Sequence, residues 1–387
     1  MFDNLSDNKK VRIGFVFNHS FFLGGGEVSF FELIRSINRD KFEPIVIVPK
    51  KGEIKSQFAE MSVKVIVNPM PPLRNIAFGN TIYALLRLIG IIKRRGFDII
   101  HANGSRACFY SGLAGRFSGV PVIWHVRETL KDYYFYDGIL ALLARAIICV
   151  SKSVQNKRFG RFGCLINNKI FIVYNGIDTN KFKKSEKERQ ILRNEFQLKE
   201  EEVFFGMVGN IIPRKAQDFF LKGWALTKKR KPDLSAKALI IGHPLEPVFN
   251  KKLQQIVSDM NLQDDIIFRN YSKKIKETYS ALDVFVLCSK SEGFSRSLLE
   301  AMCMGLPILA TKISEIEEAV REPENTLLVN IDYVEEMALA IITLSENEIL
   351  RITMGRNNRR KALLRFSLKT HIELIENIYR KLAFSRL

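Results

Sequence analysis

Short apolar runs alternate with longer amphipathic segments along this chain, and the alternation occurs twice. Runs that are rich in Val, Ile and Phe and bounded by polar turns are typical of strands buried on both faces of a sheet. They lie at 11–18, 45–49, 63–67, 97–102, 120–126 and 146–151 in the first half, and at 203–210, 236–243, 265–270, 283–289 and 306–311 in the second. Strands that alternate with helices predict parallel sheets covered by helices. We therefore expect an α/β fold with two such sheets.

A polar, charged stretch after residues 169–178 separates the two halves. The length of 387 residues exceeds one typical core and suits two domains of ordinary size. Open α/β sheets bind ligands outside the carboxyl ends of their strands. We therefore predict a cleft between two domains at these strand ends, and a helical region from residue 334 that ends in a helix over 371–384.

The composition excludes several classes of protein. Hydrophobic residues make up 47% and charged residues 26%, which is a globular composition. The five scattered cysteines form no CxxC pair, which argues against a disulfide framework or a zinc site. The most apolar segments, 82–92 and 138–150, each contain an arginine and are shorter than the ~20 residues that span a bilayer. The first residues lack an apolar signal segment, so we expect a cytoplasmic protein.

The chain is strongly basic, with a formal net charge of +19. Residues 1–180 contain 25 Lys and Arg against 13 Asp and Glu, so most of the excess lies in the first half. Such a balance suits an anionic partner such as nucleic acid, an anionic lipid surface or a phosphorylated substrate. The segment 81–96 mixes large apolar residues with basic ones and could lie on an anionic membrane, although a solubilising surface explains it equally well.

Residues 291–307 carry the strongest functional signal, because they follow a predicted strand and open a helix near Ser295. Glu292 and Glu300 are eight residues apart, which is ~12 Å along a helix and resembles the layout of a nucleoside diphosphate sugar. Carboxylates accept hydrogen bonds from vicinal diols, so one glutamate could hold the hydroxyls of the sugar and the other those of the ribose. The free N–H groups of the first turn, near Phe294, Ser295 and Arg296, would attract the phosphates. The alternative is a helix cap and a solvated surface residue.

Arg214 and Lys215 follow the strand at 203–210. Cations that meet a departing diphosphate stabilise the transition state, although an exposed basic pair is the simpler interpretation. No Asp-x-Asp motif follows a strand, so we predict no metal and no cofactor.

The turn LGGGE at 23–27 lacks the third glycine of a dinucleotide fingerprint, because Ser29 stands there, so NAD is not expected. Gly25 and Gly26 would let the backbone approach donor phosphates or an acceptor, unless the turn is only structural. His125 ends a strand, and Arg127 beside it could meet an anionic acceptor. His101 ends another strand and ranks below His125.

Together these motifs resemble the large family of retaining, nucleotide-sugar-dependent glycosyltransferases of the family 4 type, also called group 1 glycosyl transferases. EGFSRSLLEAM followed by GLP is similar to the family's EGFG-x-x-x-LEA and G-x-P signature, with Ser295 where glycine is usual. Other resembling segments follow in the family's order at 23–27, 123–128, 173–178 and 208–220. This chain has Asn210 and Ala216 where the family usually has arginine and glycine; Lys215 is in register and Arg214 is the candidate replacement for the arginine.

The resemblance implies the GT-B architecture of two Rossmann-like domains that face a central cleft. An acceptor-side domain is expected over 1–172, a nucleotide-sugar-binding domain over 173–367, and a C-terminal helix over 368–387 that packs back on the first domain. The implied activity is a retaining hexosyltransferase that moves a sugar from an NDP-sugar to a hydroxyl of a glycan. The implied acceptor is lipid-linked bacterial envelope polysaccharide (lipopolysaccharide, O-antigen or capsule), and the implied place is the cytoplasm or the inner face of the plasma membrane.

Within this scheme the catalytic candidates are His125, Lys215 and Glu292, and the acceptor-binding candidates are His125 and Arg127. The donor-binding candidates are Gly25, Gly26, Asn210, Arg214, Lys215, Glu292, Phe294, Ser295 and Glu300. Two alternatives remain. A GT-B nucleotide-sugar epimerase or hydrolase would turn over without an acceptor. A nucleic-acid-binding protein would explain the charge, but the basic residues form no stripe interleaved with aromatics and we expect no nucleic acid partner.

Overall fold

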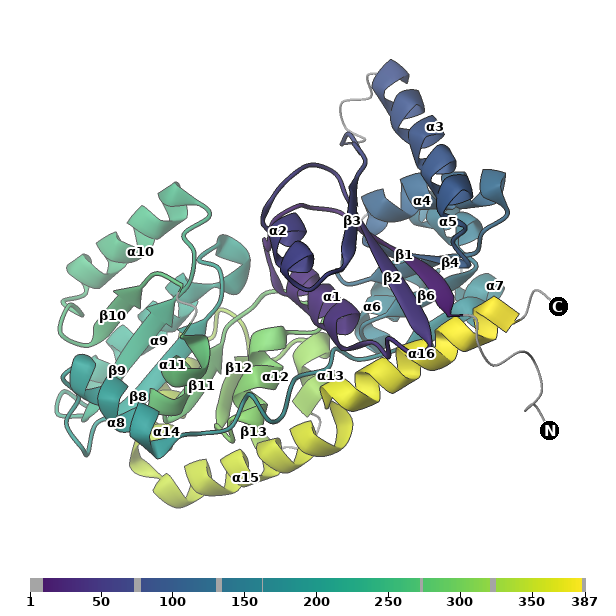
Figure 1. Cartoon of the computed structure of the whole chain (residues 1–387). Coiled ribbons are helices and arrows are strands. Elements are labelled where there is room, and N and C mark those ends of the chain that lie inside the picture. The colour runs from purple at the N-terminus through teal and green to yellow at the C-terminus, as the bar shows by residue number, and fades with distance from the viewer. Residues whose placement is uncertain are drawn as a thin grey trace. The chain divides into compact units, whose positions relative to one another are not determined.

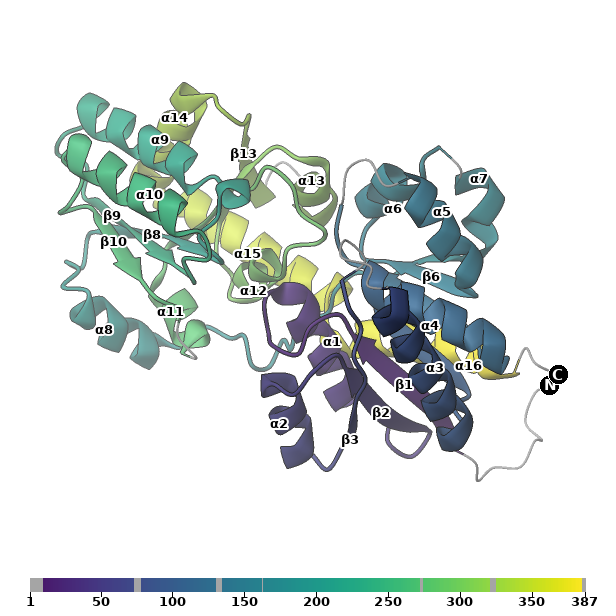
Figure 2. The ribbon, with the colours of Figure 1, turned by 90° about the horizontal axis from the view of Figure 1, so that it is seen from above.

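A computed structural model describes residues 10–72, 78–129, 134–161, 163–271, 274–320 and 325–384. The chain divides into two compact units, shown in Figures 1 and 2. Unit 1 comprises Met1–Asn175 and Lys369–Leu387, and unit 2 comprises Gly176–Leu368. The chain therefore leaves unit 1 a few residues after the predicted boundary at 172 and returns to it one residue after the predicted boundary at 367.

Unit 1 is built on a seven-stranded sheet whose order is β3-β2-β1-β4-β5-β6-β7, and every neighbouring pair is parallel. The strands are β1 (Val11–Phe17), β2 (Phe42–Val48), β3 (Lys64–Val67), β4 (Ile99–Asn103), β5 (Val122–Val126), β6 (Ala146–Cys149) and β7 (Ile170–Ile172). The helices are α1 (Gly25–Ser36), α2 (Glu53–Glu60), α3 (Phe78–Arg95), α4 (Ser105–Ser118), α5 (Tyr134–Leu143), α6 (Lys152–Phe159), α7 (Gly163–Ile166) and the 3₁₀ turn η1 (Asn167–Lys169).

The last helix of the chain, α16 (Leu368–Phe384), belongs to the core of unit 1. Its residues Ile375, Ile378 and Tyr379 are buried in one cluster with residues of β1, β2, α1 and α2. The prediction that a C-terminal helix packs back on the first domain is therefore confirmed. Figure 1 shows α16 in yellow beside the purple strands of this sheet.

Unit 2 is built on a six-stranded parallel sheet of order β10-β9-β8-β11-β12-β13. Its strands are β8 (Val203–Val208), β9 (Ala236–Ile241), β10 (Ile266–Arg269), β11 (Val284–Leu287), β12 (Ile308–Thr311) and β13 (Thr326–Val329). Its helices are α8 (Glu186–Glu195), η2 (Pro213–Lys215), α9 (Gln217–Arg230), α10 (Pro247–Asp259), α11 (Ile275–Ala281), α12 (Arg296–Cys303), α13 (Ser314–Val320), α14 (Val334–Glu346) and α15 (Glu348–Arg365).

The predicted α/β fold with two parallel sheets is confirmed. Both sheets carry apolar side chains on their strands, and α9, α10 and α14 cover the core of unit 2 on one face. The edge strand β13 was not predicted, because its short segment TLLV lies beyond the last long apolar run. No helix within the described segments is long and apolar enough to cross a membrane.

Candidate functional site

Two predicted motifs of unit 2 meet where the neighbouring strands β8 and β11 end. The loop after β8 carries Lys215, and the loop after β11 carries Glu292. Lys215 Nζ lies 2.5 Å from Glu292 Oε1. The backbone joins the loops as well, since the Lys290 N–H donates to the Arg214 carbonyl at 2.8 Å. The carboxyl ends of two parallel strands thus bring together residues that are 77 positions apart.

Glu292 is held as a carboxylate. Its Oε1 also accepts a hydrogen bond from Ser289 Oγ at 2.6 Å, and Arg214 Nη1 lies 3.4 Å from its Oε2. Burial acts to raise the pKa of Glu292, but the charges of Lys215 and Arg214 and the hydrogen bonds from Lys215 and Ser289 outweigh it and lower the pKa. Because one carboxylate faces two cations, the cluster keeps a net positive charge.

The backbone of this turn is tightly constrained. A Cβ atom on Gly242, at the end of β9, would lie 1.8 Å from the Gly209 carbonyl oxygen, so only glycine fits there. Gly209 has a φ of +150°, and a Cβ on it would lie 3.6 Å from Lys215 Cε. Ala216 adopts a left-handed conformation with a φ of +48°, at the position where the resembling family usually has glycine. The close approach of Gly242 to Gly209 therefore constrains the start of the turn that carries Lys215.

Glu300 belongs to a separate, buried cluster on α12. Its Oε1 lies 3.0 Å from Arg296 Nε, and its Oε2 accepts a hydrogen bond from Tyr279 OH at 3.1 Å. Burial raises the pKa of Glu300, and Arg296 and the Tyr279 hydroxyl offset only part of the increase. The carboxyl is therefore harder to ionise than an ordinary glutamate.

The helical spacing inferred for the two glutamates is wrong. α12 begins at Arg296 with Ser295 as its N-cap, as predicted, but residues 289–295 are not helical. Glu300 is consequently the fifth residue of α12, little more than one turn inside it rather than two. The estimate of ~12 Å fails because it treated the residues from Glu292 to Ser295 as helix.

The remaining donor-side candidates of unit 2 lie in the same loops, whereas Gly25 and Gly26 lie on α1 of unit 1. Phe294 and Ser295 are buried just before α12, and the Phe294 ring packs on Phe366 with centroids 5.4 Å apart. The carbonyl of Asn210 accepts a hydrogen bond from Gln217 Nε2 at 3.1 Å. Sequence reasoning missed Ser289 and Tyr279, and it named Arg296 only for its backbone N–H and not as the partner of Glu300. Arg296 stands four residues before Glu300 and could have been found from helical pairing, whereas no sequence signal connects Tyr279 to this site.

The histidine site of unit 1 lies at the carboxyl ends of β4 and β5. His125 is fully buried, and His101 Nε2 lies 3.0 Å from His125 Nδ1. The other nitrogen of His101, Nδ1, lies 2.5 Å from the hydroxyl of Tyr379 on α16. Burial, and next the positive charge of Arg127, hold the pKa of both imidazoles well below the ordinary value, so both rings are neutral. His101, which the sequence ranked below His125, is thus its direct partner.

Arg127 is tied to its own unit. It donates hydrogen bonds from Nη1 to Asn175 Oδ1 at 2.8 Å and from Nε to Asn103 Oδ1, and its Nη2 lies 3.3 Å from His125 Nδ1. A Cβ on Gly26, in the first turn of α1, would lie 3.3 Å from Arg127 Cδ. Gly25 is exposed in the same turn. Asn103, Asn175 and Tyr379 were not predicted as site residues.

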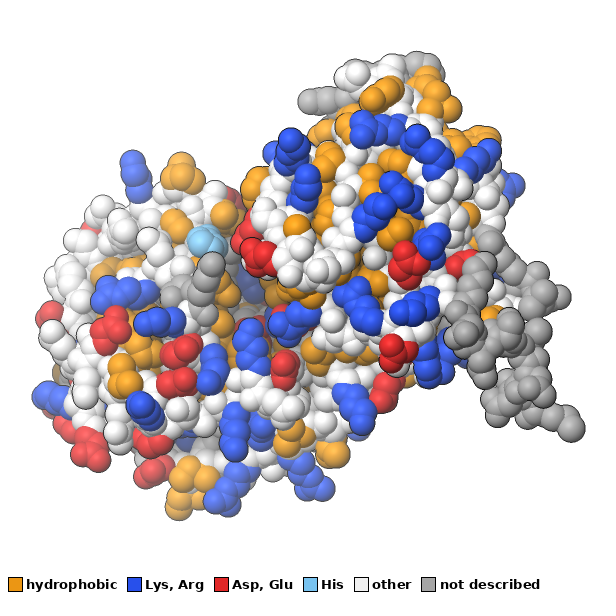
Figure 3. Space-filling model, in the orientation of Figure 1, with side chains coloured by type: hydrophobic (Ala, Val, Ile, Leu, Met, Phe, Trp, Pro, Cys, Tyr) orange, Lys and Arg blue, Asp and Glu red, His pale blue; other side chains and the backbone are white. Residues whose placement is uncertain are grey.

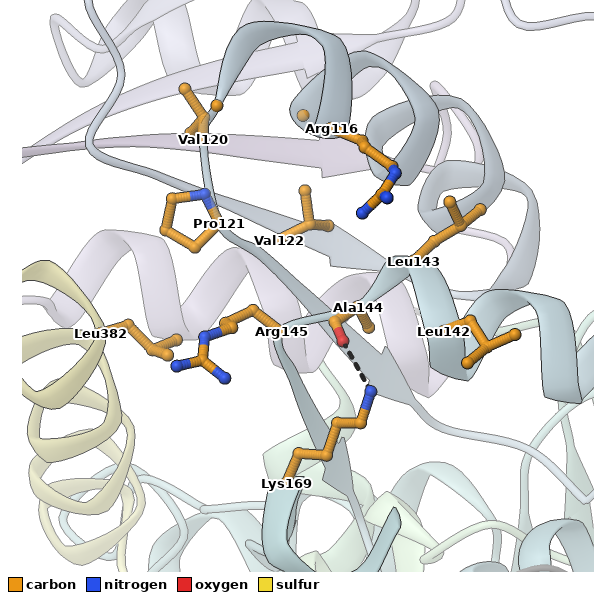
Figure 4. Close-up of a pocket in the computed structure, with 12 residues that line it drawn as sticks. Arg116, Val120, Pro121, Val122, Leu142, Leu143, Ala144, Arg145, Lys169 and Leu382 are labelled. Atoms are coloured by element: carbon orange, nitrogen blue, oxygen red, sulfur yellow. Dashed lines mark hydrogen bonds between the residues drawn. The ribbon is translucent and has the colours of Figure 1, made fainter. Parts of the chain in front are cut away.

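Two further observations bear on ligands. Within the described segments, no group of three or more His, Cys, Asp and Glu side chains could hold a metal ion. A pocket of about 430 Å³ lies at the opposite, amino edge of the unit 1 sheet (Figure 4). Three cations, Arg116, Arg145 and Lys169, line it together with apolar residues that precede β5 and β6, and Lys169 itself directly precedes β7. It is therefore separate from the histidine site at the carboxyl edge.

Sequence models of two related families match this chain, one for each unit. Residues 188–361 match "Glycosyl transferases group 1", and residues 23–181 match "Glycosyltransferase Family 4". The chain belongs to this family of group 1, family 4 type glycosyltransferases.

Full-length relatives and a solved structure agree with the family. The chain is 24% identical to an Escherichia coli UDP-Gal:alpha-D-GlcNAc-diphosphoundecaprenol alpha-1,3-galactosyltransferase, over 97% of this chain and 98% of the relative. It is 24% identical to the capsular polysaccharide biosynthesis glycosyltransferase CapM of Staphylococcus aureus, over 90% and 91%. The crystal structure of Anabaena HepE in complex with UDP and glucose superimposes with a TM-score of 0.83 at 22% identity, over 95% of this chain and 98% of HepE. This likeness shows the fold, which is the GT-B architecture of two Rossmann-like domains.

Proposed function

We propose that this glycosyltransferase moves a sugar from an NDP-sugar to a hydroxyl of a lipid-linked bacterial envelope glycan, with retention of configuration. The observation that carries the donor assignment is the contact of Lys215 with Glu292 where β8 and β11 end. Cations at this edge suit a diphosphate, and the carboxylate suits the hydroxyls of a sugar. Two similar proteins support the substrate classes: the E. coli relative uses UDP-Gal and a diphosphoundecaprenol-linked acceptor, and HepE was crystallised with UDP and glucose.

In this proposal Lys215 and Arg214 stabilise the diphosphate as the glycosidic bond breaks. The leaving group gains negative charge in the transition state, and donors fixed beforehand stabilise that charge without reorganisation. Arg214 keeps 46% of its side chain exposed and is available to a ligand, whereas Lys215 is 12% exposed and is held by Glu292. The N–H groups at the start of α12, near Phe294 and Ser295, are assigned to the same diphosphate.

The remaining residues are assigned by the chemistry they offer. Glu292, ionised and buried, accepts hydrogen bonds from the transferred sugar, and Glu300 accepts from the ribose diol. Asn210, Gly25 and Gly26 contribute polar backbone near the donor.

His125 and Arg127 of unit 1 are assigned to the acceptor side, with His125 also supporting the transferred sugar. No metal is required in this scheme, because protein cations supply the positive charge.

Product analysis tests the proposal against its main alternative. The protein is incubated with a panel of UDP-, GDP- and ADP-sugars, with and without a polyprenyl-diphosphate-linked acceptor sugar and with and without EDTA. We expect release of nucleoside diphosphate that depends on acceptor and is insensitive to EDTA, and a product whose anomeric configuration matches that of the donor. Donor turnover at the same rate without acceptor would instead identify an epimerase or a hydrolase.

We also propose that the amino edge of unit 1 contacts an anionic membrane. In Figure 4, Arg116 and Lys169 point into the pocket from opposite sides, with Arg145 beside them. Among the described residues, no carboxylate pairs with Arg116 or Arg145. Burial lowers the pKa of Lys169, and the like charge of the neighbouring Arg145 lowers it further through repulsion between the two cations. An anionic headgroup would relieve that repulsion.

Exposed apolar residues on a neighbouring helix support this membrane contact. On α3, Tyr83 and Leu86 are 58% and 63% exposed, and the last turn carries Lys93, Arg94 and Arg95. Figure 3 shows hydrophobic and basic side chains next to each other over this helix. Such a mixture suits an anionic lipid surface.

Liposome flotation tests the membrane proposal. We expect binding to anionic vesicles at low salt that weakens at high salt, and a marked loss in the double variant Arg116→Glu with Arg145→Glu. The matched control is Lys229→Glu with Lys251→Glu, which makes the same charge change on exposed residues of unit 2. Equal loss of vesicle binding in both double variants would show that net charge alone causes the binding. The amino edge of unit 1 would then not be a membrane-binding surface.

A further inference from the structure

The hydrogen bonds around His125 determine where its proton lies. A guanidinium N–H can only donate, and Arg127 Nη2 lies 3.3 Å from His125 Nδ1. His125 Nδ1 must therefore be an acceptor and carry no proton. Because the pKa of His125 is held well below its ordinary value, the ring is neutral and its single proton lies on Nε2.

The same reasoning fixes the proton positions on His101 and on Tyr379 of the C-terminal helix α16. His101 Nε2 faces the unprotonated His125 Nδ1 at 3.0 Å, so His101 Nε2 carries a proton and donates it. A neutral His101 then has a lone pair on Nδ1, which accepts from the Tyr379 hydroxyl at 2.5 Å. Burial raises the pKa of Tyr379 well above its ordinary value, so the hydroxyl keeps its proton and acts as the donor. Only this order of protons satisfies all three contacts.

The arrangement leaves one donor unused. His125 Nε2 is buried and makes no hydrogen bond to any of the residues that the structure describes. A buried N–H without a partner is unfavourable, and an oxygen of a bound ligand would supply the missing acceptor.

We infer that Tyr379 and His101 are positioning residues that fix His125 as an Nε2–H donor for an oxygen of a bound sugar. Tyr379 stands on α16, which follows unit 2 in the chain. A residue near the end of the chain therefore fixes the position of the proton on His125. The identity of the ligand rests on the proposed function, whereas the proton order rests on the geometry alone.

Nuclear magnetic resonance of the full chain labelled with ¹⁵N-histidine tests the proton order directly. The two nitrogens of a neutral imidazole differ in shift according to which one is protonated, and the variants His101→Gln and His125→Gln assign the signals. We expect one tautomer for His125, with the proton on Nε2, and the same for His101. A proton on Nδ1 of His125 would overturn the inference, and this result does not depend on whether the donor has been identified correctly.

Two sets of variants then test the positioning role. Tyr379→Phe removes only the hydroxyl; we expect mixed histidine tautomers and a kcat about tenfold lower, with nucleoside diphosphate affinity unchanged. Tyr110→Phe is the matched control, because it removes another buried tyrosine hydroxyl of unit 1, one that donates to the Pro71 carbonyl.

His101→Gln, whose amide can still donate to His125, should retain more kcat than His101→Leu. Unchanged tautomers in Tyr379→Phe, or equal losses in the two His101 variants, would contradict the assignment.

Discussion

At the residue scale, the account depends on three charged side chains that the fold places together. Lys215 and Arg214 flank the carboxylate of Glu292, and the contact between the two largely buried side chains of Lys215 and Glu292 is the stronger one, since Arg214 is 46% exposed. Their positive excess is what a departing diphosphate would meet.

Lys215→Ala is expected to lower kcat by about 100-fold, because it removes a cation that acts in the transition state. It also leaves the buried carboxylate of Glu292 with Arg214 and the Ser289 hydroxyl but without its closest cation, so the melting temperature should fall, and activity should be assayed well below it. Circular dichroism checks that the fold persists. Lys222→Ala, an exposed lysine on α9, is the control. Activity within a few-fold of the unmodified protein would remove Lys215 from the mechanism.

The raised pKa of Glu300 predicts a pH dependence of donor binding. A neutral carboxyl accepts fewer hydrogen bonds, so affinity is full above the pKa of Glu300 in the folded protein and is lost as pH falls through it. The loss should begin at a higher pH than for an ordinary glutamate, while Glu292, whose pKa is lowered, stays ionised. The titration uses an intact NDP-sugar, because the terminal phosphate of a free nucleoside diphosphate itself ionises with pH. Glu300→Gln should bind weakly and lose this pH dependence; if it keeps the dependence, another group causes it.

At the element scale, the carboxyl ends of β8 and β9 contact each other, and this contact fixes the turn that carries Lys215. The close approach of Gly242 to the Gly209 carbonyl leaves no room for a side chain, and the turn that follows holds Lys215. Strand order and turn geometry, rather than the basic residues themselves, therefore set the position of the cation.

Gly242→Ala is expected to destabilise unit 2 by about 3 kcal/mol or more and to lower activity, because its methyl group overlaps backbone that cannot move aside. Gly138→Ala on α5 is the control, since a Cβ there meets nothing within 4 Å and should stabilise by roughly 0.5–1 kcal/mol. Denaturant unfolding measures both. A neutral Gly242→Ala would show that the two strand ends are not in contact.

At the scale of the whole molecule, α16 completes the core of unit 1 from the far end of the chain. Ile375→Ala should cost about 2–5 kcal/mol, because Ile375 is fully buried in that core. Leu374→Ala, its neighbour on the same helix, is 45% exposed and should cost under about 1 kcal/mol. Similar unfolding free energies for the two variants would mean that α16 does not pack as described.

The sequence predicted the parts of this fold that depend on local patterns. Long apolar runs located β1, β8 and β11 because strands buried on both faces are apolar throughout. It also predicted that a helix opens near Ser295, and α12 begins at Arg296. It failed where a contact joins distant residues: Tyr379 lies 278 positions from His101, and no local pattern relates them. It also failed where a short loop was treated as helix, before Ser295.

The donor assignment is the central claim, and calorimetric titration of Glu292→Gln and Glu300→Gln with the cognate nucleoside diphosphate tests it most directly. That ligand has a ribose and a diphosphate but no sugar. Glu300→Gln should therefore weaken binding about tenfold or more, since it loses ribose hydrogen bonds. Glu292→Gln should bind as well as the unmodified protein or more tightly, because Lys215 is released from its carboxylate, while kcat falls. Loss of nucleotide affinity in Glu292→Gln as large as that in Glu300→Gln would contradict the account.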